Sequence, residues 1–76
     1  MNNTRRKQIS QIIEQLENLK DDIESLRDEE EEYIDAMPEN LQSSERAEEA
    51  EEARDNLDSA ADSLEECIGR MEEAIG

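Results

Sequence analysis

Several residue types that build active sites and large cores are missing from this sequence. Its 76 residues include no histidine, tryptophan or phenylalanine, and only one cysteine, one proline and one tyrosine. Without histidine the chain cannot supply the Glu-x-x-His pairs that hold di-iron centres in helical bundles. No serine, cysteine or lysine lies in a recognisable catalytic motif with a neighbouring base. We therefore expect neither enzymatic activity nor a bound metal or other cofactor.

Long apolar runs are also absent. The basic start at residues 5–7 leads into a stretch that Gln8 and Ser10 interrupt, whereas a signal peptide continues into an apolar core. No segment reaches the length of about 20 apolar residues that a membrane-spanning helix needs. The single Cys67 cannot form an internal disulfide. In a cytosolic protein we expect such a cysteine to be a small buried hydrophobic residue. We expect a cytoplasmic protein that makes no membrane contact.

Negative charge dominates the composition. The chain has 24 acidic and 8 basic residues and a net charge of -16, which is the profile of a disordered chain unless the residue pattern overrules it. Residues 1–20 hold four basic and two acidic groups, whereas residues 21–76 hold four basic and 22 acidic groups. The three basic residues at 5–7 are too few for a nucleic-acid interface. The acidic body suits a basic protein as its partner, and we expect no direct contact with nucleic acid.

Apolar residues repeat at alternating steps of three and four, which predicts two long amphipathic helices. The first series predicts a helix over about 4–37 with Thr4 as its N-cap, and the second predicts a helix over about 44–75. Pro38 disfavours helix at the preceding residue, so we expect a turn at about 38–43. The first series consists of Ile9, Ile12, Leu16, Leu19, Ile23, Leu26, Glu30, Tyr33 and Met37. The second consists of Ala47, Ala50, Arg54, Leu57, Ala61, Leu64, Ile68, Met71 and Ile75.

Folding the chain at this turn pairs the two series in antiparallel register, as an all-α coiled-coil hairpin that forms one domain over residues 1–76. Tyr33 then meets Ala50, and further pairs follow towards the termini. The only acid of the first series, Glu30, faces the only base of the second, Arg54. We expect these two side chains to form a partly buried ion pair that fixes the register. The other interpretation is that both extend to solvent at a wet seam near the turn.

A hairpin of two helices encloses little core, and chains of this length often gain stability by oligomerising. Small residues at seven-residue spacing run beside the second series, where they would let another hairpin approach closely. Ile13 and Ile34 lie beside the first series. We expect a homodimer that forms a four-helix bundle through these residues. The small residues are Ala53, Ala60, Cys67 and Ala74.

Carboxylates on the second helix follow the same alternating steps and form one continuous negative stripe. Like-charged neighbours at these spacings destabilise a helix, so stability alone does not account for the stripe. Two hairpins side by side would carry about one charge per 1.5 Å over about 48 Å, close to the value of about 1.7 Å for duplex DNA. The stripe therefore favours a nucleic-acid mimic that fills the groove of a basic nucleic-acid-binding protein. Its residues are Glu48, Glu51, Asp55, Asp58, Asp62 and Glu65, and a second acidic edge includes Asp28, Glu29, Glu31 and Glu32.

Three other interpretations stay open. An acidic outer face is common in solvated coiled coils and need not bind anything. A structural or adaptor coiled coil would use the small residues as its working surface and would depend on them rather than on the carboxylates. A regulator of a basic enzyme without mimicry would have the same salt dependence as a mimic. The second helix has only Arg46, Arg54 and Arg70 to compensate its acids, and this scarcity of bases favours mimicry.

Residues 33–46, Tyr-Ile-Asp-Ala-Met-Pro-Glu-Asn-Leu-Gln-Ser-Ser-Glu-Arg, carry a resemblance to known proteins. The chain resembles the short acidic helical-hairpin proteins of bacterial phages and other mobile elements, in which a P-E-x-L-Q-x-S-E-R turn joins an acidic helix end to a second helix rich in Glu, Ala and Leu. The resemblance implies a genomic setting in which small acidic proteins block host immunity, including CRISPR effectors with basic channels. In size and charge the chain is also similar to anti-CRISPR proteins. The resemblance therefore implies an inhibitor that acts in the cytoplasm of a host cell.

Overall fold

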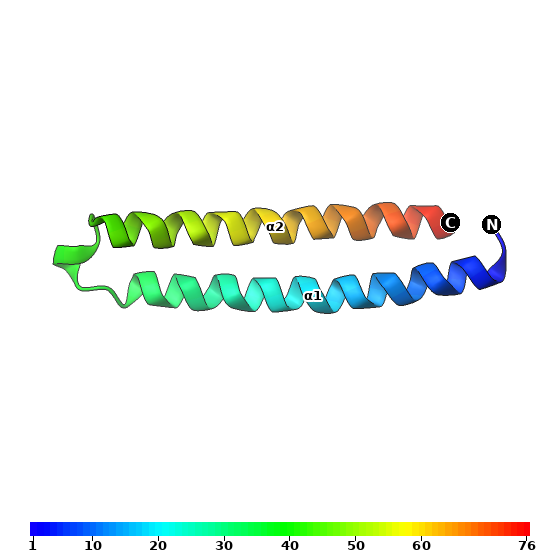
Figure 1. Cartoon of the computed structure of the whole chain (residues 1–76), viewed down its shortest axis with the longest axis horizontal. Coiled ribbons are helices and arrows are strands. Elements are labelled where there is room, and N and C mark those ends of the chain that lie inside the picture. The colour runs from blue at the N-terminus through cyan, green and yellow to red at the C-terminus, as the bar shows by residue number, and fades with distance from the viewer.

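The computed structural model describes residues 1–76 as a hairpin of two long helices. Helix α1 covers Asn3–Asp35, the short 3-10 helix η1 covers Glu39–Leu41, and helix α2 covers Glu45–Ile75. The two long helices run antiparallel and side by side, with η1 at one end and both termini at the other (Figure 1). The Cα atoms of this rod extend over 59 × 14 × 12 Å. The predicted all-α hairpin of two long helices is confirmed.

Local interactions set both ends of α1. Asn2, not the predicted Thr4, is the N-cap: its backbone is extended, and its side chain accepts a hydrogen bond of 2.8 Å from the backbone N–H three residues further on. Thr4 therefore lies inside the first helical turn. At the other end Pro38 has no N–H to donate and disfavours a helical conformation at Met37, so the helix ends two residues before Met37.

Side-chain hydrogen bonds hold the turn against the start of α2. Ser44 is the N-cap of α2: its hydroxyl accepts a hydrogen bond of 3.3 Å from the Ala47 N–H and donates one to the Leu41 carbonyl. The Gln42 side chain donates a hydrogen bond of 3.4 Å to the Met37 carbonyl. These bonds use backbone groups that neither helix satisfies internally, so they fix the point at which α2 begins.

The core of the hairpin is thin, because two helices enclose little volume. Only six of the 76 residues are buried, all of them are apolar, and no large side chain is fully enclosed. Near the turn, Met37, Ala47 and Ala50 form a small cluster, and Ile34 packs against it. Neither long helix combines the length and the apolar character that a membrane crossing requires. The six buried residues are Ile13, Met37, Ala47, Ala50, Ala61 and Ile68.

The seam between the helices agrees with the predicted pattern on α2 and on half of α1. On α2 every residue of the predicted series is buried or half-buried. In the first series the same holds for Ile9, Leu16, Ile23 and Glu30 on α1 and for Met37 just after it, which recur at seven-residue spacing. These residues pack in the order that an antiparallel coiled coil requires.

The other half of the predicted α1 seam is wrong, because α1 is rotated about its axis. The four residues predicted between these positions are exposed, and the residue that follows each of them is buried or half-buried in its place. As a result Ile13 and Ile34, expected between two hairpins, pack inside one. The stems of long basic side chains can cover such a seam while their charged ends reach outward. The outward residues are Ile12 (43% exposed), Leu19 (54%), Leu26 (53%) and Tyr33 (45%), and the inward residues are Ile13, Lys20, Arg27 and Ile34.

Replacing Ser44 by alanine should lower the free energy of unfolding by about 0.5–2 kcal/mol, because the first turn of α2 loses its side-chain acceptor. Urea unfolding followed by circular dichroism measures this loss. Ser43→Ala is the matched control, since Ser43 is exposed and does not cap the helix, and it should change stability by less than about 0.5 kcal/mol. Equal losses in the two variants would contradict the assigned cap.

Candidate functional site

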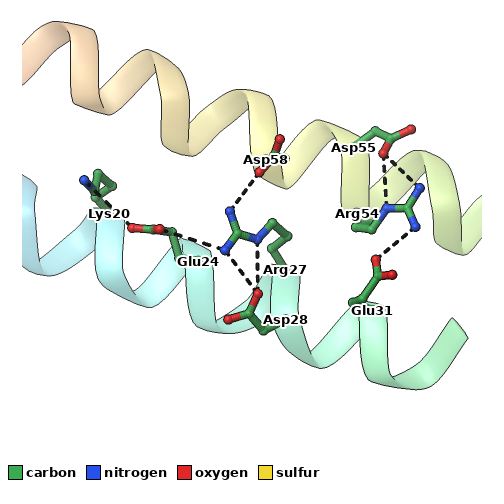
Figure 2. Close-up of polar contacts among 8 residues, drawn as sticks. All are labelled: Lys20, Glu24, Arg27, Asp28, Glu31, Arg54, Asp55 and Asp58. Atoms are coloured by element: carbon green, nitrogen blue, oxygen red, sulfur yellow. Dashed lines mark hydrogen bonds and ion pairs between the residues drawn. The ribbon is translucent and has the colours of Figure 1, made fainter. Parts of the chain in front are cut away.

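Each long helix carries one copy of the same short pattern: an arginine, an aspartate directly after it, and a second acid four residues after the arginine. The copies begin at Arg27 and Arg54. Because the helices are antiparallel, the arginine of each copy meets the last acid of the other (Figure 2). Arg27 Nη1 lies 2.8 Å from Asp58, and Arg54 Nη1 lies 2.9 Å from Glu31. These charge-assisted hydrogen bonds join α1 and α2 at two neighbouring points.

Each arginine also bonds the aspartate that follows it. Arg27 Nη2 lies 3.1 Å from Asp28, and Arg54 Nη2 lies 3.1 Å from Asp55. Each guanidinium therefore holds the aspartate that follows it and one acid of the opposite helix (Figure 2). Arg27 Nη2 also lies 3.9 Å from Glu24 on its own helix. This use of several N–H groups in fixed directions is a property of arginine that a lysine does not reproduce.

Lys20 is the third base on this side of the hairpin, and its ammonium donates a hydrogen bond to Glu65 on α2. This hydrogen bond raises the pKa of Lys20 above its ordinary value of 10.5. Hydrogen bonds to their acidic partners likewise raise the pKa of Arg27 and the pKa of Arg54. Because the folded chain holds these protons more tightly, the stabilisation from Lys20 is complete below pH 10.5 and is lost as the pH rises through its folded pKa. All three bases carry their charge near neutral pH.

The three bases lie deeper than the acids that they bind. Side-chain exposure is 23% for Lys20, 26% for Arg27 and 28% for Arg54, against 51% for Asp58 and 66% for Glu65. The aliphatic stems therefore cover the seam while the charged ends meet acids at its edge. We call this the ion-paired side. A groove on it is lined only by charged residues, namely Arg27, Asp28, Glu31, Arg54, Asp55 and Asp58.

The predicted ion pair between Glu30 and Arg54 is not formed, because Arg54 binds Glu31 instead. The rotation of α1 brings Glu31 to the ion-paired side and leaves Glu30 half-buried on the other side of the seam, in a shallow pocket beside Tyr33. Tyr33 is exposed there and is not enclosed in the seam opposite Ala50. The partner of Arg54 on α1 is therefore Glu31, one position after the predicted Glu30.

The predicted acidic stripe of α2 is half neutralised. Three of its six carboxylates bind bases: Asp55 binds Arg54, while Asp58 and Glu65 bind Arg27 and Lys20 of α1. The acidic edge of α1 shows the same division, since its members at 28 and 31 are paired and those at 29 and 32 are exposed without a base within 4.0 Å. The stripe carboxylates without a base are Glu48, Glu51 and Asp62.

Unpaired negative charge collects near the turn. Of the 24 acidic side chains, seven lie within 4.0 Å of a base, which leaves 17 without one. Residues 29–52 hold 11 acids and a single base, Arg46, so this segment accounts for a charge of -10. We call it the acidic end. It offers carboxylates at the turn end of the rod, well away from the basic start of the chain.

The opposite side of the seam is apolar. Ile12, Leu19, Leu26 and Tyr33 recur at seven-residue spacing on α1 and form what we call the large stripe. On α2 the exposed residues Ala53, Ala60, Cys67 and Ala74 recur at the same spacing and form the small stripe. Tyr33 and Ala53 line one shallow pocket, so the two stripes lie on the same side of the hairpin, which we call the apolar side.

Sequence reasoning found the small stripe but assigned the large stripe to the seam. A usable signal was present, because the repeated Arg-Asp-x-x-acid pattern implies reciprocal ion pairs and hence the rotation of α1 that turns the large stripe outward.

No group of three or more Cys, Asp or Glu side chains is arranged to hold a metal ion. Comparison of the chain with protein families, curated proteins and solved structures finds no match. The surfaces themselves therefore carry the functional argument.

A double-mutant cycle tests the assigned partner of Arg54. The coupling of Arg54→Gln with Glu31→Gln in the free energy of unfolding should exceed its coupling with Glu30→Gln, because Glu31 accepts a hydrogen bond from Arg54 and Glu30 does not. Urea unfolding of the wild type, the three single variants and the two double variants supplies both couplings. A coupling with Glu30 as large as that with Glu31 would show that the predicted register, not the described one, holds in solution.

Proposed function

We propose that this protein is a stoichiometric inhibitor that binds a basic nucleic-acid-binding protein by presenting carboxylates where the phosphates of nucleic acid would sit. The observation that carries the proposal is the concentration of unpaired carboxylates in the acidic end, which holds 10 of the 17 acids that have no base within 4.0 Å. Unpaired surface charge of one sign attracts a partner of the opposite sign and speeds its association. Binding by such a surface needs no catalytic residue.

The distribution of charge supports a groove as the binding partner. A net charge of -16 over a rod of 59 Å gives about one charge per 4 Å, and two rods side by side give about one per 1.8 Å, against about one per 1.7 Å for duplex DNA. Along α2 the unpaired Glu48 and Glu51 belong to the acidic end, and the unpaired Asp62 extends this surface towards the middle of the rod. A groove that holds a nucleic-acid duplex has both the width and the charge to accept such a rod.

The resemblance to acidic hairpin proteins of phages suggests the class of target. A protein of this kind acts in the cytoplasm of a bacterial host, against a CRISPR effector or another defence nuclease whose channel is basic. The proposal is therefore anti-CRISPR-like inhibition by nucleic-acid mimicry. The protein itself makes no contact with nucleic acid in this account, because both are negatively charged.

An adaptor coiled coil is the second candidate, and a specific observation favours it. Four large hydrophobic side chains on α1 are between 43% and 54% exposed and lie on one stripe. Exposed apolar stripes at seven-residue spacing are typical of helices that pack against further helices. An adaptor would bind through the apolar side and would be insensitive to loss of the unpaired carboxylates.

Two variants of equal charge separate mimicry from attraction by net charge alone. The first carries Glu48→Gln, Glu51→Gln and Asp62→Asn, which neutralise the unpaired members of the stripe. The control carries Glu14→Gln, Glu17→Gln and Asp21→Asn, which neutralise three unpaired carboxylates near the start of α1. Each tagged protein captures partners from bacterial lysate, followed by a salt gradient, by competition with duplex DNA and by protein identification.

Mimicry predicts that the wild type and the control retain the same nucleic-acid-binding protein and that duplex DNA releases it. The stripe variant should release this protein at a markedly lower salt concentration, because the lost contacts are electrostatic. Equal weakening in both variants would contradict mimicry by the stripe. A partner that both variants retain at high salt would favour the adaptor.

A further inference from the structure

On the apolar side the large stripe of α1 projects further from the backbone than the small stripe of α2, because its side chains are larger. Tyr33 lies beside Ala53 in the pocket that they line together. Because the helices are antiparallel, each step of seven residues towards the N-terminus of α1 corresponds to a step of seven towards the C-terminus of α2. The large stripe therefore lies alongside the small stripe for most of the length of the rod. The further neighbouring pairs in this register are Leu26 with Ala60, Leu19 with Cys67, and Ile12 with Ala74.

This side carries little net charge along the two stripes, and the charged residues Glu30, Arg46 and Glu49 line its shallow pocket at the turn end. Neither stripe contains a charged residue. The rows that flank the two stripes contain three acids and one base in eight residues, a charge of only -2 in a chain of net charge -16. Four of the flanking residues are Gln, Asn or Ser. The flanking rows are Gln8, Gln15, Asp22 and Glu29 on α1, and Glu49, Asn56, Ser63 and Arg70 on α2.

The accessible surface of the hairpin is larger than that of an ordinary folded chain of its mass. It amounts to 5735 Å², whereas a monomer of 8.8 kDa typically exposes about 4,800 Å². The excess of about 900 Å² is close to the area of about 800 Å² that each partner buries in a standard protein–protein interface. One interface of standard size would therefore bring the exposed surface of each hairpin close to that of an ordinary chain of its mass.

We propose that the apolar side binds a second copy of this chain and that the two hairpins form a four-helix bundle. The shape of the side supports self-association, because a two-fold axis along the rod sets the large stripe of each copy over the small stripe of the other. The same axis turns the ion-paired sides of both copies outward, but it also sets their two acidic ends at the same end of the dimer, so the apolar contact has to offset the repulsion between them. The dimer is argued from the apolar side alone and does not rest on the proposed inhibition, whereas the charge density calculated for two rods side by side assumes the dimer.

The molar mass in solution, measured by light scattering or sedimentation across a range of protein concentrations, tests the proposal. The wild type should be a dimer at tens of micromolar, and its dissociation constant should fall when salt is added, because salt screens the repulsion between two copies of charge -16. A wild type that stays monomeric at high salt across this range would overturn the proposal and leave the apolar side to a different protein.

Substitutions locate the interface. Leu19→Gln with Leu26→Gln should raise the dissociation constant at least about tenfold, since both leucines leave the contact in both copies. Leu41→Gln is the matched control, because Leu41 is a leucine in η1 that is 41% exposed but lies outside both stripes. It should leave the dimer unchanged. Equal dissociation constants for the stripe variant and the control would place the contact elsewhere and overturn the proposal.

The reactivity of Cys67 supplies a readout that needs no substitution. This thiol is exposed in the hairpin and belongs to the small stripe, so the dimer should cover it. Its rate of reaction with a thiol reagent should fall as the protein concentration rises, in parallel with the rise in molar mass. An unchanged rate while the mass shows a dimer would mean that the contact does not involve the small stripe, and this also overturns the proposal.

Discussion

The ion pairs between α1 and α2 determine which side of α1 faces the seam, and the other surfaces follow from this choice. Arg27 reaches Asp58, and Arg54 reaches Glu31, only when the row that contains Arg27 points at α2. That orientation also brings Lys20 to Glu65. The single contacts are modest because they lie near solvent, yet three of them in one row act together on one rotation. Together these three ion pairs therefore fix the rotation of α1 about its axis relative to α2.

The rotation divides the molecule into two unlike sides. The seam itself is thin, with six buried residues, and the stems of the basic residues cover part of it where larger apolar residues would otherwise lie. The apolar residues displaced from the seam form the large stripe and meet the alanines of α2 on the far side. The acidic surface and the apolar side are therefore available at the same time, one for the proposed basic partner and one for the proposed second hairpin.

The sequence allows the class of fold and the whole α2 seam to be predicted, because Ala47 through Ile75 repeat in a single unambiguous series. On α1 the repeat is ambiguous. Ile12 and Ile13, and likewise Tyr33 and Ile34, are neighbouring apolar residues, so either member of each pair fits a coiled-coil seam. Hydrophobic periodicity alone cannot separate two stripes that lie one residue apart.

Charge resolves this ambiguity, because the repeated pattern that begins at Arg27 and Arg54 pairs each arginine with an acid across the seam. A search for hydrophobic residues favours Leu26 over Arg27, whereas the fold selects Arg27, whose guanidinium finds acids on both helices. The same consideration applies to the acidic stripe. Its spacing was visible in the sequence, yet the neutralisation of Asp58 depends on a base that lies 31 residues away in the chain. The identity of a target protein depends on that protein's own surface and leaves no pattern in this chain.

Nuclear Overhauser contacts between methyl and ring protons test the rotation of α1 most directly. The account predicts contacts within one chain from Ile34 to the methyl groups of Ala47 and Ala50, because Ile34 packs against that cluster. Leu26, which is 53% exposed, should show no contact within one chain to the seam residue Leu57. Contacts within one chain from Leu26 to Leu57, together with an Ile34 that contacts nothing on α2, would restore the alternative seam and contradict the account.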